Sequence, residues 1–368
     1  MKFSSWNPFS CQAATLPPNL VLTAKLIFIG LVGKGYYNDL SDHFLPVIGI
    51  FEKMGPPAVF TGILKITFWA AGVSLLLNRG VRNCCLILGI LFLIVPLSSQ
   101  LSYSNAKILC GCIFLLIGLH PGGPPWLIRV QLALIYFGAG FNKLLEPDWL
   151  SGQYFEYWMH QIIGQKYYVL AASWFPAMTL SQIMGWLTIT VELGLSAGFL
   201  IPRWYPVVIR VGILFHAVSV LLAQKDFGIF YGALMASYLS CVAWPKSSIV
   251  FYNDKNTFWR VAGAFWKRID FDGIFRWRGM NELPQNNLTP TENLCLEQDG
   301  RRYIGFQASK RGVLYTPFPY FVLVFCLVFP QEEYAKYRYW AVFVFMLVVP
   351  LADVALSFLG WVRRRYFF

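Results

Sequence analysis

The chain has 368 residues, of which 57% are hydrophobic and only 13% are charged, and its formal net charge is +12. A soluble globular protein does not carry this much apolar sequence, and several apolar runs reach the ~20 residues that a helix needs to cross a bilayer. The composition therefore excludes a soluble globular protein and predicts a polytopic all-α membrane protein. We attribute the positive charge to Lys and Arg in cytoplasmic loops and not to nucleic-acid binding.

Ten apolar runs, taken in chain order, predict about ten transmembrane helices. The ninth run is short for a span and suits a re-entrant segment equally well. Basic side chains gather in one set of the linkers between runs, and acidic side chains gather in the other set. This asymmetry predicts a multi-pass integral membrane protein with both termini in the cytoplasm, and we expect a bacterial inner membrane. The runs are centred on residues 21–37, 57–77, 83–98, 106–119, 124–145, 178–200, 206–223, 228–244, 318–330 and 339–361.

Two hydrophilic segments interrupt the apolar runs. The first, residues 146–177, is predicted on the outer side, where the helical spacing of its apolar residues favours a helix along the membrane surface. The second, residues 246–316, is predicted on the cytoplasmic side. Its pattern predicts a strand at 247–253, a helix at 256–268, a strand at 272–280 and a hairpin that turns at Asp299-Gly300.

The fifth apolar run ends in the stretch YFGAGFNKLLEPDWLSG, which places Lys143 near the point where the helix leaves the membrane. An ammonium inside the bilayer costs about 3 kcal/mol or more unless it reaches water or a partner. Lys143 is therefore a candidate functional residue, with the alternative that it snorkels to the headgroups and only anchors the helix. Glu192 in the sixth run and His216 in the seventh are further candidates, and for each the alternative is a role in helix packing.

Metal and nucleic-acid binding receive no support from the remaining polar residues. The sequence contains eight cysteines, and none forms a CxxC motif. Asp, Glu and His form no cluster with metal-ligand spacing, so we expect no metal site. The basic clusters within residues 246–316 are predicted to face anionic lipid or an acidic partner.

The stretch around Lys143 resembles the signature of the HTTM membrane domain, a superfamily that includes the vitamin K-dependent gamma-carboxylase. The resemblance extends over about residues 20–244, and the positions that match the signature are Gly140, Lys143, Leu144, Asp148, Trp149 and Gly152. It implies that Lys143 is the base that deprotonates a hydroquinone and that His216 polarises the site or shares its proton. The same resemblance makes Glu192 the third catalytic candidate.

Substrate contacts are predicted for Asn142, Asp148 and Trp149, which lie around the lysine in the same signature. The chain also departs from the carboxylase. Asn142 stands where the carboxylase has a second lysine, and the sequence has no large globular region on the outer side. The departures weaken the expectation of peptide carboxylation.

The cytoplasmic segment is similar to the opening of DCC proteins, a thioredoxin-like family. Those proteins carry F-D-G-x-C-x-x-C at the start of a helix, whereas Asn256 and Trp259 occupy the two cysteine positions here. A later motif of the family matches at Asp299, Gly300, Gly305 and Ala308. Disulfide exchange needs a thiolate and a resolving cysteine. The resemblance therefore implies a degenerate module that acts as a scaffold or docking surface.

The predicted architecture is a polytopic all-α membrane protein with a small cytoplasmic α/β thioredoxin-like insertion. Its domains are an HTTM-like transmembrane domain at residues 1–245, the degenerate DCC module at 246–316 and two C-terminal transmembrane helices at 317–368. We interpret the protein as a non-catalytic or accessory subunit or scaffold of a larger membrane complex. The alternative is a membrane enzyme that uses Lys143 as a base on a quinone-like or lipid-soluble substrate.

The lipid bilayer and other membrane proteins are the predicted partners, and nucleic acid is not. A quinone or a vitamin K-like hydroquinone is the expected cofactor in the enzymatic alternative.

Overall fold

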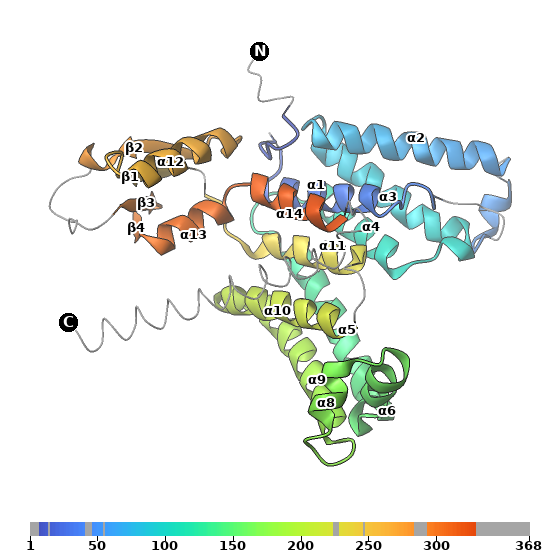
Figure 1. The fold of residues 1–368 in the computed structure, drawn as a ribbon. Coiled ribbons are helices and arrows are strands. Elements are labelled where there is room, and N and C mark those ends of the chain that lie inside the picture. Colours follow the sequence, from blue (N-terminus) through green and yellow to red (C-terminus); the bar gives the residue numbers. More distant parts are fainter. Residues whose placement is uncertain are drawn as a thin grey trace. The chain divides into compact units, whose positions relative to one another are not determined.

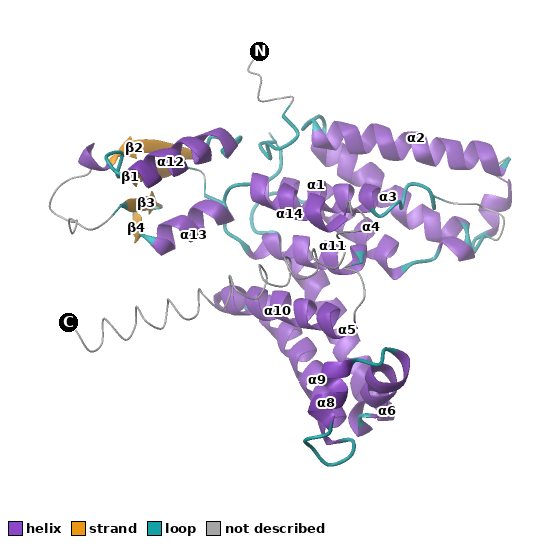
Figure 2. Cartoon of the chain, in the orientation of Figure 1, coloured by secondary structure: helices purple, strands orange, loops and turns teal. Residues whose placement is uncertain are grey.

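The structure is a computed structural model that describes residues 7–13, 15–40, 46–53, 56–223, 228–245, 247–282 and 293–328. These residues are mostly helical and include one small sheet (Figures 1 and 2). They divide into two compact units. The described part of the first comprises residues up to 123 together with 242–328, and that of the second comprises residues 124–241.

The first unit contains the apolar helices that precede residue 123 and a last helix near the end of the described chain. α3 and α4 lie close together because glycines face the neighbouring backbone. A Cβ on Gly89 would meet the backbone nitrogen of Leu115 at 2.8 Å, and one on Gly118 would meet that of Leu86 at 2.9 Å. Small residues at such contacts are typical of helix packing in membranes. The elements are α1 (Pro18–Gly33), η2 (Gly49–Lys53), α2 (Pro57–Leu76), α3 (Val81–Ser98), η3 (Gln100–Ser102), α4 (Asn105–Gly118) and α14 (Phe318–Val328).

A four-stranded sheet forms the rest of the first unit, with the strand order β2-β1-β3-β4. β1 pairs in parallel with β2 and antiparallel with β3, and β3 pairs antiparallel with β4. The predicted hairpin is confirmed, because Asp299 and Gly300 both have positive φ (48° and 72°), as a type I′ turn requires. The elements are β1 (Ser248–Tyr252), α12 (Thr257–Ile269), β2 (Phe275–Gly279), η7 (Met280–Glu282), β3 (Leu294–Gln298), β4 (Arg301–Ile304) and α13 (Phe306–Leu314).

The segment 7–13 connects this sheet to the helices of the first unit. The side chain of Lys25 on α1 is fully buried and donates to three backbone carbonyls, two of them in this segment at 2.6 and 2.9 Å. Asp272, just before β2, accepts hydrogen bonds from the Ser10 hydroxyl at 2.8 Å and from the Cys11 amide at 2.7 Å. The segment therefore acts as a strap between α1 and the sheet.

All secondary-structure elements in the described residues of the second unit are helices. Segment 146–177, predicted on the outer side, is largely helical as predicted, but it is not one continuous helix. Gly152 and Gly164 adopt positive φ (83° and 60°), and each of them separates two short helices. The elements are α5 (Trp126–Leu145), α6 (Pro147–Ser151), α7 (Gln153–Glu156), the π-helix η4 (Tyr157–Ile162), α8 (Lys166–Ala172), α9 (Thr179–Leu200), η5 (Pro202–Trp204), α10 (Tyr205–Ala223), α11 (Ile229–Ser237) and η6 (Tyr238–Cys241).

Four helices in the described ranges are long and apolar enough to cross a membrane: α2, α3, α9 and the helical stretch Pro202–Leu222. Three more apolar helices are shorter, namely Pro18–Gly33, Asn105–Gly118 and Ile229–Cys241. These helices indicate a membrane-associated protein, whereas the ten-span count stays a prediction. The tenth predicted run, residues 339–361, lies outside the described residues.

Candidate ligand-binding site

Glycines of the predicted signature bring α5 and α6 against α9. A Cβ on Gly140 would lie only 3.2 Å from Cβ of Glu192. Gly152 has φ +83°, and a Cβ there would lie 2.6 Å from the backbone nitrogen of Gln182. Only glycine allows both this backbone conformation and this approach. The close packing places the last turn of α5 beside the middle of α9.

Lys143 and Glu192 form an ion pair across this contact. Nζ of Lys143 donates to Oε1 at 2.9 Å and to Oε2 at 2.8 Å, and it lies 3.3 Å from the carbonyl oxygen of Ala139. The Lys143 side chain is 20% exposed and the Glu192 side chain 8% exposed. The ring centroid of Trp149 lies 5.0 Å from Nζ, within cation–π range. Each charge thus has a partner that offsets part of the cost of burying it.

His216 on α10 belongs to a second polar cluster. Its Nε2 lies 2.6 Å from the hydroxyl of Tyr136 on α5, and that hydroxyl also hydrogen-bonds to the hydroxyl of Tyr238. A Cβ on Gly212 would lie 2.6 Å from the Tyr238 hydroxyl, so the glycine makes room for this cluster. His216 is only 2% exposed, and its Nδ1 has no hydrogen-bond partner in the part of the chain that the structure describes.

Both polar clusters line one cavity of about 780 Å³. This volume lies within the ~300–1,000 Å³ range of small-molecule sites. Lys143, Glu192 and Trp149 line the cavity together with Tyr136 and His216. Most other lining residues are apolar or aromatic, and they come from α5, α9, α10, α11 and the segment between α6 and α8. The structure thus brings together the lysine, the carboxyl group and the imidazole that the sequence placed on three separate runs.

Of the remaining predicted site residues, one lines the cavity and two do not. Trp149 lines the cavity and stacks on Tyr154, with 4.0 Å between the ring centroids. Asn142 and Asp148 are exposed and do not line the cavity, so their role in substrate binding stays a prediction. Within the described residues, no group of three or more His, Cys, Asp or Glu side chains could hold a metal ion.

Glu156 links the aromatic segment 153–168 to α9. Its carboxylate accepts hydrogen bonds from Tyr168 at 2.5 Å and from Ser181 on α9 at 2.9 Å. A ring nitrogen of His160 lies 3.0 Å from the other carboxylate oxygen. The hydrogen bond from Tyr168 is the main cause that lowers the pKa of Glu156, since it favours the ionised carboxylate. Phe155 and Met159 of the same segment line the cavity.

The sequence did not predict that Tyr136 and Tyr238 form a hydrogen-bonded cluster with His216. Tyrosine in an apolar run is compatible with ordinary helix packing, so it gives no signal of a polar cluster. The unpaired nitrogen of His216 and the pairing of Lys143 with Glu192 depend on how the helices pack, which one sequence does not give.

Comparison with known protein families adds a single finding. Residues 121–244 match the family model of the HTTM domain. The chain contains an HTTM domain. The predicted resemblance is confirmed for these residues, and the HTTM domain includes every residue that lines the cavity. The DCC resemblance of residues 246–316 stays a prediction, as does their cytoplasmic location. Comparisons with curated proteins and with solved structures gave no significant match.

Proposed function

We propose that the HTTM domain binds a lipid-soluble, quinone-class molecule in its cavity and takes a proton from a hydroxyl group of its reduced, hydroquinone form. The observation that carries this proposal is the Lys143–Glu192 pair, which opens on a cavity of about 780 Å³. Aromatic side chains along the wall, among them Trp149, Tyr154 and Trp158, suit the stacking of a flat ring. The enzymatic alternative from the sequence is therefore the function that the geometry supports best.

The ion pair suggests a different role in proton transfer for Lys143 and for Glu192. The ammonium of Lys143 is hydrogen-bonded to both carboxylate oxygens, so Glu192 is the group with lone pairs ready to accept a proton. A ligand hydroxyl beside the pair would donate its proton to the carboxylate. The ammonium would then stabilise the negative charge that develops on the ligand oxygen. Lys143 thus acts with Glu192 as one acid–base unit.

The histidine cluster suits the second oxygen of such a ligand. The Tyr238 hydroxyl can donate to Tyr136, whose own hydroxyl then donates to Nε2 of His216. This arrangement places the imidazole proton on Nδ1, the buried nitrogen for which the described residues provide no hydrogen-bond partner. Once the cavity wall opens around this buried N–H, His216 would donate a hydrogen bond to a ligand oxygen, which is the polarising role that the resemblance implies.

Quenching of tryptophan fluorescence by menadione tests the proposal, with the full chain in lipid nanodiscs. The variant Lys143→Met/Glu192→Gln removes both charges together, so no unpaired charge is left in the membrane. We expect saturable quenching of the unmodified protein and about ten-fold weaker binding by the double variant, the result of losing about 1.4 kcal/mol of polar contact. Lys166→Gln, an exposed lysine outside the cavity, is the matched control and should bind normally. Equal binding by all three proteins would overturn the proposal.

An accessory or scaffold role in a larger membrane complex is the second candidate function, and the sheet region favours it. Asn256 and Trp259 occupy the positions where DCC proteins have their two cysteines, and both residues have structural roles here. The Asn256 side chain caps α12 by accepting from the backbone nitrogens of Phe258 and Trp259, and Trp259 packs against the core of the sheet. α12 also exposes Phe258, Val261 and Phe265 on one side, which suits docking to another membrane protein.

The proposed domain organisation follows the sequence boundaries. We propose a multi-pass protein of about ten spans in a bacterial inner membrane, with both termini in the cytoplasm. The HTTM-like domain occupies residues 1–245, a thioredoxin-like module residues 246–316, and two C-terminal helices residues 317–368. The parallel β1–α12–β2 unit followed by the β3–β4 hairpin and α13 supports a thioredoxin-like module.

A further inference from the structure

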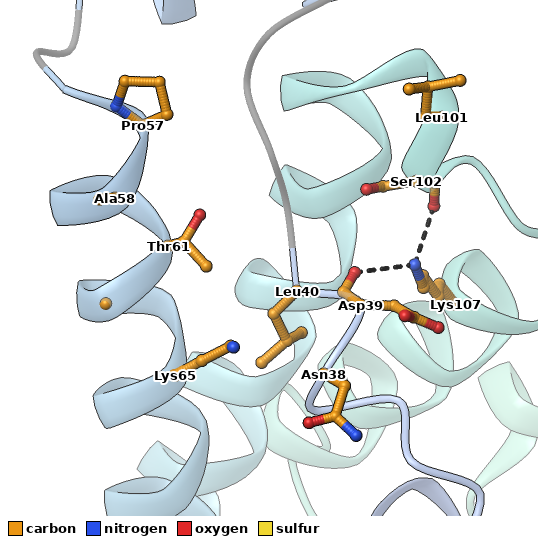
Figure 3. Close-up of a pocket in the computed structure, with 11 residues that line it drawn as sticks. Asn38, Asp39, Leu40, Pro57, Ala58, Thr61, Lys65, Leu101, Ser102 and Lys107 are labelled. Atoms are coloured by element: carbon orange, nitrogen blue, oxygen red, sulfur yellow. Dashed lines mark hydrogen bonds between the residues drawn. The ribbon is translucent and has the colours of Figure 1, made fainter.

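The first unit contains a second cavity, of about 800 Å³, with a different chemistry (Figure 3). The start of α2, η3, the first turn of α4 and residues 38–40 line it. Two lysines, Lys65 on α2 and Lys107 on α4, contribute to its wall, together with the polar side chains of Asn38, Thr61 and Ser102. The proposed function uses none of these residues.

Lys107 is fixed in place by the protein. It is 4% exposed, and its Nζ donates to the carbonyl oxygens of Asp39 and Ser102, both at 3.1 Å (Figure 3). The ring centroid of Tyr36 lies 5.9 Å from Nζ, at the outer limit of cation–π contact. Neutral carbonyls and a ring orient the ammonium, and the Asp39 carboxylate, which lies beyond ion-pair distance, offsets part of its charge. The cavity therefore has one positive charge held in a fixed position.

Lys65 supplies the second ammonium from the opposite wall. It lies eight residues after Pro57, about 12 Å along α2 at 1.5 Å per residue. In Figure 3 its side chain extends from α2 toward Leu40. Over the ranges that the structure describes, neither Lys65 nor Lys107 has a carboxylate within ion-pair distance. Among the described residues that line the cavity, two ammonium groups therefore stand against one carboxylate, the exposed side chain of Asp39.

We propose that this cavity binds the phosphate of an anionic phospholipid. Two ammonium groups with nearby hydroxyl and amide groups match the charge and the hydrogen-bond acceptors of a phosphodiester. A lipid is favoured over a soluble phosphate because α2 is long and apolar enough to cross a membrane. Val59, Ile63 and Ile66 on α2 are exposed, so acyl chains can lie along the same helix that supplies Lys65.

Native mass spectrometry of the full chain tests this proposal after purification with phosphatidylcholine and phosphatidylglycerol. Lys65 is half-buried on the helix surface, so Lys65→Gln should fold. We expect this variant to retain about five-fold less phosphatidylglycerol, the loss that accompanies one lysine near an anionic headgroup. Lys65→Arg should retain the lipid, and the exposed-lysine control Lys166→Gln should behave as the unmodified protein. Equal retention by Lys65→Gln and Lys166→Gln would overturn the proposal.

A second arm distinguishes the two sources of phosphate. Inorganic phosphate at millimolar concentration should neither displace phosphatidylglycerol nor raise the melting temperature. Displacement of the lipid by inorganic phosphate would overturn the lipid assignment. Menadione binding by Lys65→Gln should remain normal, because the quinone-like ligand is proposed for the other unit. The failure of one proposal therefore leaves the other intact.

Discussion

Removing one charge of the Lys143–Glu192 pair should destabilise the protein far more than removing both. The two side chains are 20% and 8% exposed and meet at 2.8 and 2.9 Å, so either charge alone would be left without its partner in a poorly hydrated site. Breaking a buried pair in this way costs about 3–5 kcal/mol. For a cooperative unit of about 150–250 residues, a loss of about 3 kcal/mol corresponds to a fall in Tm of about 6–12 °C.

The assay is thermal unfolding in nanodiscs of Lys143→Met, Glu192→Gln and the double variant. Replacing both charges removes their attraction and their desolvation cost together, so the double variant should lie within about 2 kcal/mol of the unmodified protein. The coupling energy from this cycle should then reach several kcal/mol. Additive effects, with the double variant as unstable as the sum of the two single variants, would refute the paired geometry. The lysine would then be an independent interfacial anchor.

Three further predictions concern stability. Gly152→Ala should lower stability by about 1–3 kcal/mol in the same melting assay, because φ is +83° and a Cβ would lie 2.6 Å from a backbone nitrogen of α9; an unchanged Tm would contradict this contact. The pKa of Glu156 is lowered below 4.5, so its contribution is complete above that pH and is lost as the pH falls through the folded-state value. Tyr168→Phe should weaken the fall of Tm at acid pH, and an unchanged dependence of Tm on pH would count against the hydrogen bond. Asp272→Ala should cost about 1–3 kcal/mol and open the strap to protease, since the Cys11 amide loses its acceptor; equal protease resistance would contradict the strap.

The secondary structure of the sheet region follows closely from sequence because local signals determine it. Alternating residues predict β1, and Asp299-Gly300 supplies the two positive φ angles of a hairpin turn. The outer segment was harder to predict, because its apolar spacing is helical on both sides of Gly152 and Gly164. Only the backbone conformation shows that these glycines interrupt it. Local periodicity thus predicts the type of an element better than its continuity.

The candidate site shows a similar division. Lys143, Glu192 and His216 could be singled out because ionisable groups are costly inside a membrane. Which of them pair depends on contacts between helices far apart in sequence, and no local pattern contains that information. The role of Tyr136 was hidden for another reason, since a buried tyrosine and a tyrosine that orients an imidazole look alike in a sequence.

Identification of the small molecules retained by the protein tests the central claim most directly. The full chain should be purified in mild detergent from its native membrane and its extract analysed by mass spectrometry, in parallel with Lys143→Met/Glu192→Gln and Lys166→Gln. We predict a quinone-class molecule in near-equal amount to the protein in the unmodified and Lys166→Gln samples, and its loss from the double variant. Absence of any such molecule from all three samples, or its equal retention in all three, would contradict the account.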